Sequence, residues 1–506
     1  MKRNERILLS VSFSLYLFFF FLLLPFFRHQ INPDSISLIN IAQKYLAGEF
    51  SLAVNGYWPP LISWFLSVFI LVFSDPILSF KILSFFVGIF ALFAFYRLLT
   101  NTGIGFVIKA IAMGTAVIGV LYFSITVASA DFLTSSLMVF YLSMIAQKDA
   151  FEKKYFFVEI GIIGFLLYLS KTYGFFFFLA HFSATAMAVI IKLKKKKQAS
   201  LNYALGILIF VMLSMMWVIP ISMKYKTLTL GTTGKFNYAA WGPVFEQVRR
   251  PYIHAMELPD SLSTSSWDDP SNVYKEAWNP LSSKDNMKHQ AKLLKKNIPW
   301  FIDLLNSFSY LSIIILVSAM VFIFLKKKRR EFYIFLLAVV FSAAGYILIA
   351  FEQRYLWVNF FVLIAMAAIA IDSAIKKENV KNTLFAIIML TFLIMPARNL
   401  YSDLNINKDI YEAYQEIKPL AVKGNTGSDS NRPFMTILSF YMKNHYFGAF
   451  GKEIDSETFK TELKENDIEY YFMFDEESTR VYDALNENYE LIYRTNKFRI
   501  LRRINE

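Results

Sequence analysis

Residues 32–66, NPDSISLINIAQKYLAGEFSLAVNGYWPPLISWFL, are the stretch on which the interpretation of this sequence depends. They follow the first hydrophobic segment and carry one early acidic residue, Asp34, before a predicted short amphipathic helix at 35–46. A turn at 55–56 then leads into an aromatic-proline elbow at 57–60, Tyr-Trp-Pro-Pro. An ionisable group at the border of a hydrophobic segment is costly to keep there, which indicates a functional site.

The composition is that of a polytopic membrane protein. Hydrophobic residues make up 56% of the 506 positions, including 53 phenylalanines, and runs of about 20 apolar residues are long enough to cross a bilayer as helices. The chain has no cysteine, which excludes disulfides, thiolate metal sites and a cysteine nucleophile. The net charge of +13 lies in short blocks between apolar runs, a pattern typical of membrane topology signals and not of nucleic-acid binding.

The first apolar run, 7–27, follows the basic segment 1–6. It is longer than the hydrophobic part of a signal peptide and lacks a small-residue end, so we expect a retained helix with a cytoplasmic N-terminus. Further spans are predicted at 77–96, 105–124, 131–147, 155–169, 172–191, 201–222, 305–325, 332–350, 354–373 and 381–396.

Segment 61–73 is apolar but short and follows two prolines, which favours a re-entrant or interfacial segment. If it does not cross, alternation of about eleven transmembrane helices places every short basic loop in the cytoplasm, as the positive-inside rule requires. These loops are 97–109, 147–154, 192–197, 326–330 and 376–381. If it crossed, all of them would lie outside.

The same alternation places five ionisable residues at membrane borders on the opposite face: Asp34, Asp131, Lys171, Glu352 and Arg354. Their shared side predicts a single site at the outer interface. The first outer loop, 28–60, and a long outer loop, 223–300, lie on this face, and a loop as long as the second is expected to cover or form a binding site.

Residues 397–506 lack a spanning run and are predicted to form an extracytoplasmic soluble α/β domain behind a transmembrane catalytic domain at 1–396. We expect a strand at 433–440, a helix capped by Asp455 or Ser456 and ending near 465, a strand at 468–474 and a hairpin at 490–493 and 497–502. No catalytic motif is visible in this region.

Five motifs in order resemble one known family. They are P-D-S-x-S-x-x-x-I-A-Q-x-Y-L-x-G from Pro33, the elbow at 57–61, SADFLT at 129–134, LSKTYG at 169–174 and EQRYLW at 352–357. The sequence resembles the GT-C membrane glycosyltransferases, in the branch of protein O-mannosyltransferases and lipid A aminoarabinose transferases. The resemblance covers the spanning region, and the soluble tail matches only in type.

The resemblance implies a transferase that takes a sugar from a polyprenyl-phosphate carrier on the non-cytoplasmic face. By this resemblance, the family's catalytic aspartate corresponds to Asp34, and the aspartate of its second outer loop corresponds to Asp131. A carboxylate near the acceptor hydroxyl can take its proton, which makes Asp34 the expected general base. Lys171 and Arg354 are the expected ligands of the donor phosphate, and direct displacement would invert the anomeric carbon.

Six further residues are expected to contact substrate: Tyr57, Trp58, Glu352, Tyr355, His254 and Trp267. Relatives often carry an acidic or basic residue before Pro-Pro, where this chain has Trp58, and the long loop offers His254 as a metal ligand. The sequence therefore assigns no cofactor. Oxygen ligands from Asp34 and Asp131 suit Mg²⁺ or Mn²⁺, so a divalent metal stays an alternative.

Each candidate also has a purely structural interpretation. Asp34 and Asp131 could cap the helices that follow them, Lys171 could extend from a helix end to the interface, and Glu352 could simply pair with Arg354.

Two other functions stay open, a transporter or flippase for a lipid-linked saccharide and a polysaccharide polymerase or ligase. The expected location is the cell (inner or cytoplasmic) membrane, and the expected partners are membrane lipids, the lipid-linked donor and an acceptor glycan, lipid or protein.

Overall fold

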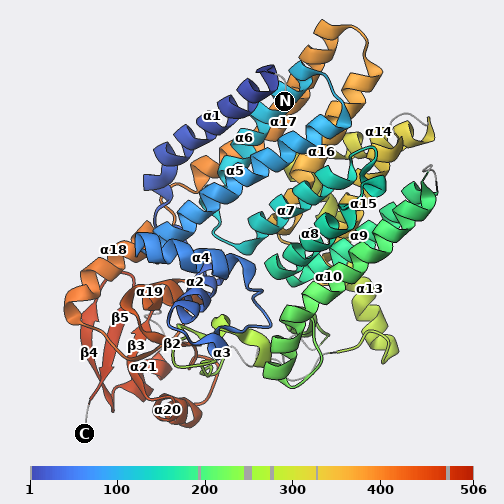
Figure 1. Ribbon diagram of the computed structural model, residues 1–506. Helices are drawn as coiled ribbons and strands as arrows, with labels where there is room; N and C mark the ends of the chain where they lie inside the picture. Colours follow the sequence, from blue (N-terminus) through green and yellow to red (C-terminus); the bar gives the residue numbers. More distant parts are fainter. Residues whose placement is uncertain are drawn as a thin grey trace.

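The computed structural model describes residues 3–191, 195–243, 253–273, 278–325, 329–474 and 479–504. A bundle of long helices forms most of the molecule, and a small domain with a five-stranded sheet packs at one end of it (Figure 1). Helices α2 (Pro33–Leu46) and α4 (Leu61–Phe73) lie between the bundle and the sheet domain. Residues 32–66 therefore sit where the two parts meet.

Eight helical segments within the described ranges are long and apolar enough to cross a bilayer. They are α1 (Arg3–Phe27), α5 (Pro76–Thr102), α6 (Phe106–Thr126), α9 (Thr172–Ile190), α10 (Lys196–Tyr225), Arg330–Leu348 with α15 (Arg329–Ala343), Gln353–Ala374 with α16 (Trp357–Ala374), and α17 (Glu378–Ser402). Helices α4, α7 (Ala130–Ile145) and α8 (Phe156–Ser170) are apolar but shorter. The chain is an integral membrane protein. The number of about eleven crossings and the non-crossing role of α4 stay predictions.

The predicted span at 305–325 is wrong as one continuous helix. Helix α13 (Lys284–Phe308) ends inside this segment, and α14 (Ser312–Phe324) continues at an angle of 98°. The break has a local cause, because the Ser309 hydroxyl accepts a hydrogen bond from the Leu311 N–H at 3.1 Å and the Ser312 hydroxyl donates to the Leu305 carbonyl at 2.6 Å. These side chains replace the helical bonds that would otherwise continue the chain.

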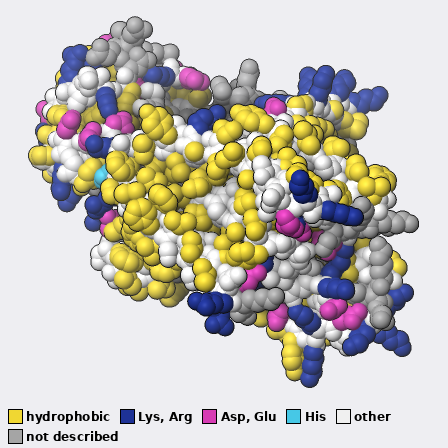
Figure 2. Space-filling model, turned by 90° about the horizontal axis from the view of Figure 1, so that it is seen from above, with side chains coloured by type: hydrophobic (Ala, Val, Ile, Leu, Met, Phe, Trp, Pro, Cys, Tyr) yellow, Lys and Arg dark blue, Asp and Glu magenta, His cyan; other side chains and the backbone are white. Residues whose placement is uncertain are grey.

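Helix α16 is the centre of the bundle. Every residue from 357 to 369 is buried, and the helix contacts α5, α6, α7, α15 and α17. A helix that is apolar on all sides can be buried in this way in the core of a large protein. On the face shown in Figure 2, hydrophobic side chains gather over the middle of the molecule, with lysines and arginines toward its edges.

Neither candidate aspartate is the cap of its helix, so the capping interpretation of Asp34 and Asp131 is wrong. Asn32 caps α2 and accepts the Ser35 N–H at 2.9 Å, while Ser129 caps α7 and accepts the Asp131 N–H at 3.3 Å. The first turns of both helices are thus satisfied by other side chains. Both carboxylates are left to make tertiary contacts.

The sheet of the C-terminal domain has the strand order β2-β1-β3-β5-β4. Strand β1 (Asn425–Ser428) is parallel to both β2 (His445–Ala449) and β3 (Ile468–Met473), whereas β5 (Arg499–Arg503) is antiparallel to β3 and to β4 (Tyr489–Arg494). The predicted strand at 468–474, the hairpin and the helix capped by Asp455, α20 (Ser456–Glu465), are confirmed. The other helices of this region are α18 (Lys408–Ile417), α19 (Arg432–Met442) and α21 (Thr479–Leu485).

The predicted strand at 433–440 is wrong, because this segment forms α19. Its buried side chains include Phe434, Ile437 and Leu438, which have the i, i+3, i+4 spacing of a helical face. Pro433 sits in the first turn, where a helix tolerates proline.

Helical structure also occurs inside the long loop 223–300, in α11 (Thr233–Ala240) and in the first half of α13. Helix α17 runs past residue 396 to Ser402, and the division of the chain at that residue stays a prediction. Short helical turns complete the fold at α3 (Phe50–Ala53), η1 (Ala150–Glu152), η3 (Ser266–Asp268), η4 (Pro270–Asn272), η5 (Tyr346–Leu348), η6 (Gln353–Leu356) and η7 (Lys418–Leu420).

Candidate active site

Four segments far apart in the sequence bring their charged residues together at one place. Arg354 in η6 lies at the centre: its Nη2 is 2.7 Å from an Asp34 oxygen, and its Nε is 3.4 Å from an Asp131 oxygen. The Nε is also 2.6 Å from Glu352. Asp34 comes from the first turn of α2 and Asp131 from the first turn of α7. One guanidinium therefore joins three carboxylates.

Lys171, between α8 and α9, forms an ion pair with the other oxygen of Asp131. Its ammonium lies 3.8 Å from the ring centre of Tyr355 and 5.4 Å from that of Tyr346. Aromatic faces attract a cation, so the two tyrosines hold the lysine side chain on the site side of the bundle.

The carboxylates differ in exposure. The side chains of Asp34 and Asp131 are 17% and 8% exposed, whereas that of Glu352 is 54% exposed. Glu352 therefore costs the least to move away from Arg354, because water can solvate its charge when the ion pair opens.

Trp267 extends the cluster from the long loop 223–300. Its indole N–H donates to Asp34 at 2.8 Å, while its backbone carbonyl accepts from the Ser37 hydroxyl at 3.0 Å and from the Trp58 indole N–H at 3.1 Å. The ring also packs beside Tyr57, at 5.7 Å between ring centres. Asp34 is thus held from two sides, by a cation and by a neutral donor.

A buried polar seam ties the loop segment around Trp267 to helix α2. Asn40 donates to Asp268 at 2.7 Å, and Lys44 pairs with Asp260 at 2.6 Å. Asp268 is fully buried, and this burial raises the pKa of its carboxyl despite the nearby Lys44 charge and the hydrogen bonds it accepts. The seam fixes Trp267 relative to the helix that carries Asp34.

The other side of this loop segment is held by edge strand β2. The Tyr446 N–H donates to the Thr264 carbonyl at 2.8 Å, and the Met256 N–H donates to the Phe447 carbonyl at 2.7 Å. A strand edge offers such unpaired backbone groups. The C-terminal domain thereby reaches the site through the segment that carries Trp267.

Solved structures provide the comparison. The fold is similar to that of ArnT from Cupriavidus metallidurans bound to undecaprenyl phosphate, with a TM-score of 0.60, 11% identity and coverage of 98% of each chain. The mycobacterial arabinofuranosyltransferase AftD matches with a TM-score of 0.50 and 12% identity, over all of this chain and 42% of AftD. No protein-family model matches the sequence, and no curated protein sequence does.

Both of these proteins have the GT-C architecture. The chain has the GT-C fold. The predicted fold class, a polytopic helical membrane protein of this type with a small C-terminal α/β domain, is confirmed. At these identities the likeness concerns the fold alone.

Within this GT-C fold, nine of the ten predicted site residues lie together. His254 lies apart, paired with Glu462 of α20 at 2.5 Å. Sequence reasoning missed Tyr346, because an isolated tyrosine in an apolar stretch carries no signal of its own. It also missed Asn40 and Asp268, whose buried pairing joins residues more than two hundred positions apart.

The positions of Asp34, Asp131 and Arg354 also decide whether the two aspartates could share a divalent metal. Within the described ranges no three histidine, aspartate or glutamate side chains form a metal-binding group. A cation between Asp34 and Asp131 would have to take the place of the Arg354 guanidinium, which lies within ion-pair distance of both. These two carboxylates in this arrangement do not fit a shared Mg²⁺ or Mn²⁺.

Proposed function

We propose that this protein transfers a sugar from a polyprenyl-phosphate-linked donor to an acceptor hydroxyl at the outer face of the membrane, with Asp34 as general base. The observation that carries the proposal is the convergence of Asp34, Asp131, Lys171 and Arg354 from four separate segments into one ion-paired cluster. The GT-C fold, which the chain shares with a protein solved with undecaprenyl phosphate, adds support.

In this proposal Arg354 and Lys171 bind the donor phosphate. Both side chains are mostly buried, and a guanidinium can hold two phosphate oxygens at once. The phosphate replaces Glu352, the exposed partner of Arg354, because the loss of that pair costs little in water. Asp131 keeps Lys171 in place during the exchange.

The chemical step is a direct displacement. The acceptor hydroxyl gives its proton to Asp34 while its oxygen attacks the anomeric carbon. The bond between that carbon and the donor phosphate oxygen breaks, the electron pair leaves with the phosphate, and the configuration inverts. A positioned base contributes about 10²–10⁴-fold to such a step, and fixed positive charges stabilise the departing phosphate.

The test is transfer by the full chain reconstituted in proteoliposomes with a panel of polyprenyl-phosphate sugars, scored by release of polyprenyl phosphate. Asp34→Asn is expected to lower release by about 100-fold or more while undecaprenyl phosphate still binds. Asp483→Asn, which removes an exposed aspartate of α21, is the matched control and should keep full activity. Full activity of Asp34→Asn, or translocation of the lipid without any glycosyl product, would contradict the proposal.

A further inference from the structure

Helix α13 carries five lysines on one side. At 3.6 residues per turn they fall within an arc of about 120°, and all five are exposed. We call this set the lysine face: Lys284, Lys288, Lys292, Lys295 and Lys296. Two aspartates share the arc, Asp285, which pairs with Lys288 at 3.0 Å, and Asp303. Five lysines against two aspartates leave the side strongly positive.

The two other sides of α13 have different characters. Leu293, Asn297 and Phe308 are buried against the protein. The Asn297 amide donates to the Ile347 and Ile349 carbonyls at 2.9 and 3.0 Å, just before the segment that carries Arg354. The third side is apolar yet exposed and consists of Met287, Ile298 and Ile302. This apolar stripe borders the lysine face directly.

The orientation of α13 follows from its neighbour. Helix α14 exposes apolar side chains such as Ile314, Val317 and Phe324, as a lipid-facing helix does, and α13 lies at 98° to it. Membrane helices tilt on average by only about 20° from the bilayer normal. Helix α13 therefore runs close to the plane of the membrane surface.

Aromatic side chains mark the same depth. The Lys296 ammonium lies 5.4 Å from the ring centre of Trp241 and 5.7 Å from that of Trp300. Tryptophan concentrates at the boundary between hydrocarbon and water. The lysines thus sit where lipid phosphate groups are found.

We propose that α13 is an interfacial helix that binds anionic phospholipids: its apolar stripe enters the bilayer edge and its lysine face contacts the lipid phosphates. Charge complementarity selects the partner, because among the described residues no carboxylate lies within ion-pair distance of Lys292 or Lys295. A basic amphipathic helix in the interface gains affinity from both contributions. This inference does not depend on the proposed transfer reaction.

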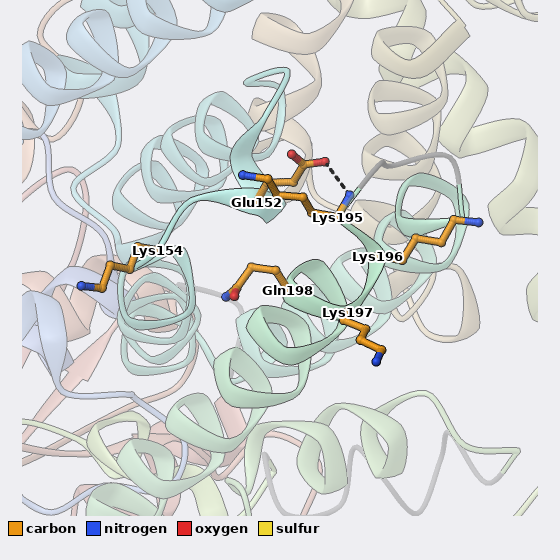
Figure 3. Close-up of a pocket in the computed structure, with 6 residues that line it drawn as sticks. All are labelled: Glu152, Lys154, Lys195, Lys196, Lys197 and Gln198. Carbon is orange, nitrogen blue, oxygen red and sulfur yellow. Dashed lines mark hydrogen bonds between the residues drawn. The ribbon is translucent and has the colours of Figure 1, made fainter.

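A second lysine cluster lies at the start of α10 and serves as the control for the lysine face. Lys154, Lys195, Lys196 and Lys197 line a hollow of about 630 Å³ at the start of α10. There Lys154, Lys196 and Lys197 point in different directions, and Glu152 accepts the Lys195 backbone N–H at 3.5 Å (Figure 3). Helix α10 has 30 residues and is thus about 45 Å long. At its other end, the Tyr225 hydroxyl accepts a hydrogen bond from the Gly56 N–H, in the turn before the elbow, at 3.0 Å.

The test uses the cysteine-free full chain in nanodiscs of phosphatidylcholine, alone or mixed equally with phosphatidylglycerol. A spin label at Ala291→Cys, an exposed position on α13, is compared with one at Glu457→Cys, an exposed position on α20. The label at 291 is expected to be more accessible to oxygen than to a water-soluble nickel chelate, and the label at 457 the reverse. Equal nickel accessibility at both positions would overturn the proposal.

The lipid preference is measured as enrichment of headgroup-labelled phosphatidylglycerol around position 291. The triple variant Lys288→Glu, Lys292→Glu and Lys295→Glu should lower this enrichment by at least about fivefold, the effect of about one lysine near an anionic surface. The variant Lys195→Glu, Lys196→Glu and Lys197→Glu should leave it unchanged.

Unchanged enrichment in the α13 variant would overturn the proposal. So would protection of the label by soluble polyphosphate without any enrichment of phosphatidylglycerol. If the α13 variant does not fold, the measurement on the unaltered chain is the test. The absence of phosphatidylglycerol enrichment over neutral lipid around position 291 would then refute the lipid assignment.

Discussion

Trp267→Phe isolates the neutral hydrogen bond to the proposed base. The change removes the indole N–H that donates to Asp34 at 2.8 Å, but it keeps an aromatic ring against Tyr57 and Phe236. A hydrogen bond to a charged group contributes about 1.5–3 kcal/mol, which corresponds to about 10–150-fold in rate if the whole bond acts in the transition state. The expected result is a fall of that size in turnover, measured as polyprenyl phosphate release by proteoliposomes.

Trp58→Phe is the matched control for this prediction. Its indole N–H donates to the Trp267 backbone carbonyl at 3.1 Å, and neutral hydrogen bonds contribute only about 0.5–1.5 kcal/mol. Turnover should therefore fall by about tenfold at most. Both variants should keep the thermal midpoint of the unaltered chain within a few degrees. If Trp267→Phe is as active as the unaltered chain, or no worse than Trp58→Phe, the Trp267 hydrogen bond does not position Asp34 for catalysis.

Two further variants test the surroundings of Asp34. Glu352→Gln removes the exposed carboxylate that pairs with Arg354. The variant should bind undecaprenyl phosphate about 2–5-fold more tightly, as measured by microscale thermophoresis. Weaker binding would refute the proposal that phosphate replaces Glu352 at Arg354. Lys171→Met removes the proposed charge-assisted contact to phosphate and should weaken the same binding about tenfold or more. Unchanged affinity would exclude Lys171 as a phosphate ligand.

Asp268→Asn tests the seam through the dependence of stability on pH. Burial raises the pKa of Asp268 in the folded chain, so its contribution to stability is full below the unfolded pKa of about 4 and is lost as pH rises through the folded value. The thermal midpoint of the variant should therefore rise relative to that of the unaltered chain as pH increases. A difference that stays constant with pH would show that Asp268 does not titrate in this way.

The sequence largely predicted which segments form helices and which form strands. Long apolar runs predict spanning helices because the bilayer requires internal backbone hydrogen bonding, and alternation at 468–474 predicts strand β3. Predictions failed where hydropathy or residue composition suggested one structure and local side-chain hydrogen bonds or residue spacing favoured another. The apolar run at 305–325 hides the Ser309 break, and the aromatic and β-branched residues of α19 resemble a strand until the spacing of Phe434, Ile437 and Leu438 is considered.

The candidate site divides in the same way. The sequence by itself determined which side chains could do chemistry, because Asp34, Asp131, Lys171 and Arg354 are costly at the ends of apolar segments. Only the tertiary structure decided that Arg354 joins the two aspartates and that Trp267 supplies the second partner of Asp34. These contacts depend on the packing of α2 against a loop segment held by strand β2. Such distances between remote segments are set by the whole fold, because no local preference of the chain encodes them.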